Sequence, residues 1–129
     1  KEVKSLRRHG CALLVKIGQR HPSALLSVFD HLRSTIVDEL HQRRRVLQRM
    51  EYVTLIEALV LVSNEHANFN VQSAFLENVS SPVCNQLRSM ESVISNVAAF
   101  INYIGLDCDT GDVDKRGENR GELAFCIQV

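Results

Sequence analysis

Two clusters of arginine are the residues of this sequence that most readily suggest a binding chemistry. Arg7 and Arg8 are adjacent, and Arg43, Arg44 and Arg45 form a second run. A guanidinium group donates two parallel hydrogen bonds to one phosphate, so both clusters are candidates for contacts to a polyanion. The alternative for each is a solvated helix face or loop. We favour that alternative for residues 43–45, because they lie between two predicted helices.

Charge is unevenly distributed along the chain, although the whole chain has no net charge. Residues 1–50 hold eleven Lys and Arg against four Asp and Glu, a net charge of +7, and residues 51–129 have a net charge of −7. This asymmetry favours a polyanion or an acidic partner for the first half of the chain.

The stretch 107–118 imitates the calcium-binding loop of an EF-hand. Asp107, Asp109 and Glu118 fall at loop positions one, three and twelve. Gly111, however, stands at position five, where an oxygen ligand belongs, and Asp112 stands at position six, which needs glycine. We therefore predict a solvated acidic loop that binds no calcium.

No group of residues predicts catalysis or a bound metal. The histidines lack the i, i+4 spacing of a metal-ligand pair: they are His9, His21, His31, His41 and His66. Glu57, in an apolar helical segment, is better explained as a structural hydrogen-bond partner than as an acid or base. There is no glycine-rich phosphate-binding loop, so any GTP must belong to a partner. We predict no enzyme activity, no metal and no cofactor.

Apolar residues recur at helical spacing in five segments, which are 2–20, 23–37, 47–63, 70–87 and 92–104. Pro22 should end the first, and Ser23 should cap the second. Pro82 should kink or break the fourth, and Gly105 should end the fifth. The longest purely apolar run, residues 58–62, is too short to span a membrane.

The second and fourth of these helices begin about 47 residues apart, a spacing typical of two-helix solenoid repeats. Small residues at positions 10–12 would let a neighbouring helix approach closely, as stacking requires. We predict an all-α fold, a HEAT-repeat α-solenoid segment of antiparallel helix pairs cut from a longer protein. The alternative is a single five-helix bundle. The predicted parts are an inner helix (1–22), two HEAT repeats (23–66 and 67–105), a flexible acidic loop (106–121) and the start of another helix (122–129).

Several stretches resemble a known family in one register along nearly the whole chain, apart from residues 106–121 and a length difference near Arg43. They are Leu6-Arg7-Arg8-His9, Pro22, Phe29-Asp30-His31-Leu32, Met50, residues 57–64 (EALVLVSN), Phe75-Leu76-Glu77, Pro82-Val83, Ala99-Phe100-Ile101, Tyr103, Gly105 and Phe125-Cys126. These stretches resemble the middle of the exportin-5 family of karyopherins, which belongs to the importin-β class.

The resemblance implies a ring-like solenoid of HEAT repeats that carries RNA hairpins out of the nucleus with GTP-bound Ran. The cargo would be microRNA precursors, with transfer RNA as a further candidate. Such a receptor would contact nucleoporins and shuttle between nucleus and cytoplasm. The alternative is a karyopherin scaffold that binds protein cargo only.

The resemblance also implies an RNA-binding site. It places the Arg7–Arg8 pair on the inner channel that holds the protruding end of the hairpin, and Gln48 and Arg49 at the same channel. This sequence departs from the family pattern by having Arg49 where that pattern has glutamine. The predicted RNA-binding residues are thus Arg7, Arg8, Gln48 and Arg49.

Overall fold

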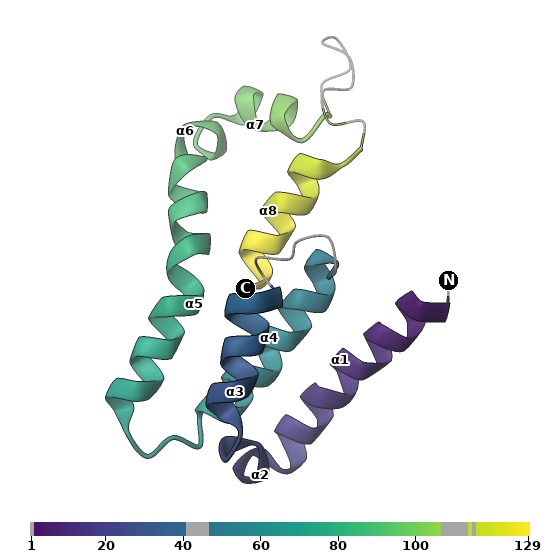
Figure 1. The fold of residues 1–129 in the computed structure, drawn as a ribbon. Coiled ribbons are helices and arrows are strands. Elements are labelled where there is room, and N and C mark those ends of the chain that lie inside the picture. Colours follow the sequence, from purple (N-terminus) through teal and green to yellow (C-terminus); the bar gives the residue numbers. More distant parts are fainter. Residues whose placement is uncertain (1, 41–46, 107–113, 115) are drawn as a thin grey trace. The chain divides into compact units, whose positions relative to one another are not determined.

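The structure is a computed structural model that describes residues 2–40, 47–106, 114 and 116–129. Within these residues every regular element is a helix, which confirms the all-α prediction (Figure 1). The elements are α1 (Glu2–Arg20), α2 (Pro22–Leu26), α3 (Phe29–Arg33), the π-helix η1 (Ser34–Leu40), α4 (Arg49–Ser63), α5 (Phe69–Ser89), α6 (Glu91–Ile94), α7 (Val97–Tyr103) and α8 (Glu118–Gln128).

The chain forms two compact units, residues 1–79 and residues 80–129. Among the described helices, none combines the length and the apolar content that crossing a membrane requires. The division into HEAT repeats stays a prediction.

Helices α1 and α4 form the main packing of the first unit. Arg7 pairs with Glu51, which is 44 residues later, and Gly18 lies against Val62, which is also 44 residues later. A constant offset means that the two helices run parallel. The second turn of α1 therefore lies beside the first turn of α4. A stack of two-helix repeats has the same parallel arrangement, because every second helix points in the same direction.

The close approach of α1 to α4 occurs at Gly18 rather than at the predicted small residues. Gly10 and Ala12 are exposed, and a Cβ added to Gly10 would meet nothing within 4 Å. A Cβ added to Gly18 would lie 3.5 Å from the carbonyl oxygen of Ala58. Of the predicted three, only Cys11 is buried.

The helix predicted over 23–37 is instead three short elements, α2, α3 and η1, interrupted at residues 27–28. The prediction that Ser23 caps α2 was wrong, because Pro22 already occupies the first turn of the helix and His21 precedes it. The fixed φ of proline suits the first helical position. The Ser23 hydroxyl donates to Oε2 of Glu65 at 3.2 Å.

A cluster of aromatic rings joins the remaining elements of the first unit. Phe29 of α3 makes edge contacts with His66, at 4.8 Å between ring centroids, and with Phe75 of α5, at 5.2 Å. Such edge-to-face pairs add stability beyond the burial of their area. Phe29 and Phe75 are both buried, so the cluster holds α3, the turn after α4 and the start of α5 together.

Helix α5 is not broken at Pro82, contrary to one of the two outcomes predicted there; it runs without interruption from Phe69 to Ser89. Proline lacks the N–H that would bond to the carbonyl of Asn78. Pro82 and Asn78 are both exposed, so that carbonyl can bond to solvent instead.

In the second unit the end of α5 packs against α8, which runs in the opposite direction (Figure 1). Val83, Met90 and Cys126 are buried there, and Leu87, Tyr103, Phe125 and Val129 pack around them. The helix predicted over 92–104 is divided into α6 and α7, because Asn96 starts a new helix by accepting a hydrogen bond from the Ala99 amide at 3.1 Å.

Gly105 ends α7, as predicted. Its φ of 69° lies in the left-handed region that glycine adopts without strain. The amide of Gly105 donates to the Asn102 carbonyl and the amide of Leu106 donates to the Ile101 carbonyl, each at 3.0 Å. These two bonds form a Schellman motif.

Helix α8 begins at Glu118, four residues before the predicted boundary at 122, with Gly117 as its N-cap and Asp114 bound to its first turn. The buried carboxylate of Asp114 accepts hydrogen bonds from the amides of Asn119 and Arg120, each at 3.1 Å, and from Nε of Arg120 at 3.2 Å. Burial acts to raise the pKa of Asp114, but these hydrogen bonds and the Arg120 charge together lower it. Residues 107–113, which hold most of the EF-hand imitation, lie outside the described residues.

Candidate functional site

The junction of α1 and α4 contains a buried carboxylate that the sequence reasoning missed. Glu51 is only 2% exposed, and Nε of Arg7 lies 3.4 Å from each of its oxygens. Oε2 of Glu51 also accepts a hydrogen bond from the Gln48 amide at 2.9 Å. The Gln48 side chain in turn accepts from the Glu51 amide, which completes a capping box at the start of α4.

Electrostatics explain why an acid occupies this position. The first turn of a helix carries a partial positive charge, and a carboxylate there is stabilising. The parallel packing of α1 on α4 brings the positive charges of Arg7 and Arg8 to the same turn. Glu51 offsets both sources of positive charge. The Gln48-x-x-Glu51 spacing is the pattern of a capping box, and this signal in the sequence could have revealed it.

Arg8 differs from its neighbour, because its side chain is exposed. Its Nη2 donates to Oε1 of Gln48 at 3.1 Å, which links α1 to the capping residue of α4. This bond uses one of the five N–H donors of the guanidinium group. The Arg8 guanidinium is thus held by Gln48 through Nη2, while the side chain as a whole remains exposed to solvent.

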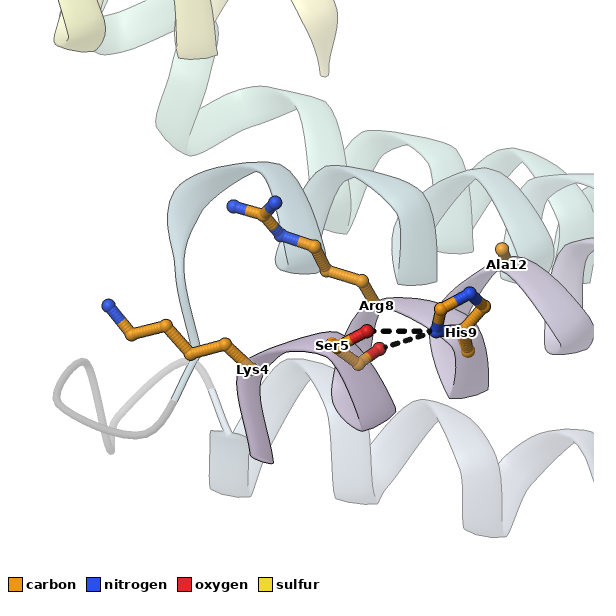
Figure 2. A pocket seen from close by; sticks show the side chains of 5 residues that line it. All are labelled: Lys4, Ser5, Arg8, His9 and Ala12. Atoms are coloured by element: carbon orange, nitrogen blue, oxygen red, sulfur yellow. Dashed lines mark hydrogen bonds between the residues drawn. The ribbon is translucent and has the colours of Figure 1, made fainter. Parts of the chain in front are cut away.

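A shallow pocket lies on the same part of α1, and Figure 2 shows the five side chains that line it: Lys4, Ser5, Arg8, His9 and Ala12. In Figure 2 the Lys4 and Arg8 side chains extend away from the helix, whereas the His9 ring folds back toward Ser5. Nδ1 of His9 donates to the Ser5 carbonyl oxygen at 2.8 Å. Three of the five lining residues are basic, so the pocket is suited to an anion.

The structure brings three of the four predicted RNA-binding residues together. Arg7, Arg8 and Gln48 meet at the junction of α1 and α4, and Arg49 is exposed at the first position of α4. The second basic cluster, residues 43–45, lies outside the described residues.

Cys11 lies next to this network. Burial raises the pKa of its thiol, and the nearby Glu51 carboxylate raises it further, against the smaller effects of a backbone hydrogen bond and Arg7. A raised pKa makes the thiolate, which is the nucleophilic form of cysteine, less accessible. Among the described residues, moreover, no three His, Cys, Asp or Glu side chains gather as metal ligands.

A model of the Exportin-5 family matches residues 1–110. The chain is 39% identical to human Exportin-5 over 130 residues and 38% identical to mouse Exportin-5, in both cases over 97% of its own length. An uncharacterized protein of Schizosaccharomyces pombe is 27% identical over 105 residues, which cover 81% of the chain.

No solved structure matches the chain. The matched region is 11% of the human and mouse proteins, so the chain corresponds to a small part of these relatives. The family match, the two mammalian relatives and the all-helical structure lead to the same conclusion: the chain belongs to the Exportin-5 family.

Proposed function

We propose that this chain is part of the wall of a nuclear export receptor, and that the junction of α1 and α4 faces an RNA hairpin. The receptor would carry the hairpin to the cytoplasm together with GTP-bound Ran, contact nucleoporins and shuttle between the two compartments. The cargo would be microRNA precursors, with transfer RNA as a further candidate. The receptor would have no enzyme activity and no cofactor of its own, since the GTP belongs to Ran.

The observation that carries the RNA-facing surface is the placement of Arg8. Its guanidinium is held by Gln48 on one side and exposed on the other, at the edge of a basic pocket. Family membership supports the export function.

Duplex RNA is recognised by its shape, through contacts to phosphates and 2′-hydroxyl groups. An exposed arginine suits a phosphate, because its planar group donates two hydrogen bonds at once. Lys4 and His9 line the same pocket and add charge and hydrogen-bonding capacity. None of these contacts would read a base, so this surface would accept hairpins of many sequences.

The test is Arg8→Glu in the full-length receptor, with hairpin affinity measured in the presence of GTP-bound Ran. Charge reversal should weaken hairpin binding by about 1–3 kcal/mol, a typical value for a hydrogen bond to a charged group. The loss should shrink as salt rises, because the contact is to backbone charge. Ran binding should not change.

Arg20→Glu is the matched control, since Arg20 is also an exposed arginine of α1 but lies at the opposite end of the helix. The assignment of this surface to RNA is contradicted if Arg8→Glu binds the hairpin like wild type. It is also contradicted if Arg20→Glu loses more affinity than Arg8→Glu. Hairpin binding that does not depend on salt in the wild-type receptor would instead favour a scaffold for protein cargo only.

A further inference from the structure

We infer that Glu51 is a positioning residue for the RNA-facing edge, and that its partner Arg7 serves inside the protein rather than on RNA. This inference rests on the function proposed above for the same junction. It assigns different roles to two arginines that are adjacent in the sequence.

Glu51 is buried and holds Arg7 inside the protein. Its side chain is 2% exposed, and its oxygens are engaged by Nε of Arg7 at 3.4 Å and by the Gln48 amide at 2.9 Å. The Arg7 side chain is 31% exposed. If Arg7 turned toward a phosphate, it would leave a buried carboxylate without its cationic partner, which is strongly unfavourable.

Gln48 links Glu51 to Arg8 through two hydrogen bonds. Glu51 binds the backbone amide of Gln48 and so holds this residue in the capping position of α4. The side chain of Gln48 then accepts from Nη2 of Arg8 at 3.1 Å. In this network the Glu51 carboxylate therefore positions the exposed guanidinium of Arg8 through Gln48, without a direct contact between Glu51 and Arg8.

The direction in which Glu51→Gln changes hairpin affinity distinguishes a positioning role from a purely electrostatic one. Glu51→Gln removes a negative charge from a surface proposed to bind a polyanion, so electrostatics alone predicts tighter binding. Positioning predicts the opposite. Glutamine keeps only one uncharged acceptor oxygen, whereas Arg7 and the Gln48 amide share two carboxylate oxygens of Glu51. We expect the affinity for a synthetic RNA hairpin to fall by about tenfold, the change that corresponds to one charge-assisted hydrogen bond.

Glu57→Gln is the matched control, because Glu57 is an exposed carboxylate on the same helix. This variant should bind the hairpin as tightly as wild type, or slightly more tightly. All affinities are measured on the full-length receptor with GTP-bound Ran.

A second set of variants tests Arg7 itself. Arg7→Gln leaves Glu51 buried and unpaired, so its hairpin affinity should fall. The double variant Arg7→Gln/Glu51→Gln replaces the ion pair with two amides that can bond to each other, and its affinity should return toward that of wild type. The dependence of its affinity on salt should also stay the same. If Arg7 contacts a phosphate, the double variant stays weak and its salt slope falls by about one.

Glu51→Gln binding as tightly as wild type, or tighter, overturns the inference. So does a double variant that stays weak with a reduced salt slope. Circular dichroism and Ran binding report whether each variant is folded, and if Glu51→Gln does not fold, the double variant decides. Should Arg8→Glu weaken binding while Glu51→Gln does not, only the positioning role is wrong. Should neither weaken it, the proposed RNA-facing surface fails as well.

Discussion

Gly18 of α1 lies against Ala58 of α4 with room for one methyl group. A Cβ on Gly18 would be 3.5 Å from the Ala58 carbonyl oxygen and 3.7 Å from side-chain atoms of Leu61 and Val62, which are ordinary contact distances. Helices α1 and α4 thus approach closely at Gly18, at a distance that alanine would also allow. That approach in turn brings Arg7 and Arg8 to the first turn of α4.

Gly18→Ala should raise the stability of the chain by about 0.5–1 kcal/mol, because alanine favours a helix interior over glycine. Gly18→Leu should lower it by about 1–3 kcal/mol, because the larger side chain overpacks the contact with α4. Thermal unfolding followed by circular dichroism measures both changes. At Gly10, which has nothing within 4 Å, both alanine and leucine should be stabilising. A stable Gly18→Leu variant would contradict the packing described above.

Two substitutions of Gln48 separate its two roles. Gln48→Ala removes the cap of α4, so we expect a loss of stability of about 1 kcal/mol together with weaker hairpin binding. Gln48→Ser keeps a capping oxygen, but its short side chain should not reach Arg8. This variant should retain stability and lose hairpin affinity. Equal hairpin affinities for Gln48→Ser and wild type would show that Gln48 does not support Arg8 in RNA binding.

Asp114 should make the second unit less stable in acid. Its pKa in the folded protein is lowered by the hydrogen bonds it accepts. The stability that this group contributes is therefore present above the pKa of an unfolded aspartate, about 3.9, and is lost as pH falls below that value through the folded pKa. Asp114→Asn keeps an acceptor oxygen without the titration. Urea unfolding at pH 6 and pH 3 should show a smaller decrease in stability for Asp114→Asn than for wild type.

Gly105→Ala should destabilise the end of α7 by about 1–2 kcal/mol, because a residue with a Cβ is strained at positive φ. Gly105→Asn should cost less, since asparagine tolerates the left-handed conformation better. Thermal unfolding of the two variants provides the comparison. If alanine and asparagine are tolerated equally, the left-handed end of α7 is not required.

The stretch 107–118 should bind no calcium, because it lacks an oxygen ligand at Gly111 and a glycine at Asp112. Isothermal titration should show no binding at micromolar calcium. Binding that disappears in Glu118→Gln would contradict this prediction and restore the EF-hand interpretation.

The sequence by itself determined where helices form and where several of them end. Apolar residues at helical spacing predicted α1, α4 and α5 to within a few residues, and Gly105 predicted the end of α7. These are local properties, because spacing and φ preference depend on the residue and its near neighbours. The divided segments 23–37 and 92–104 show the limit of this reasoning, since both are apolar at helical spacing and neither forms one helix.

Only the tertiary structure decided which helices pack together. The end of α5 packs against α8 as well as against Tyr103 of α7, because Phe125, Cys126 and Tyr103 all lie around Val83 and Met90. Such pairings join residues far apart in the chain, so no local pattern contains them.

The same limit applies to the candidate site. Arg7 and Arg8 are chemically identical neighbours, and the sequence predicted the same role for both. On a helix, adjacent side chains point about 100° apart, so only one of them can face a given neighbour. The parallel packing of α4 turned Arg7 toward the buried carboxylate of Glu51 and left Arg8 exposed beside Gln48.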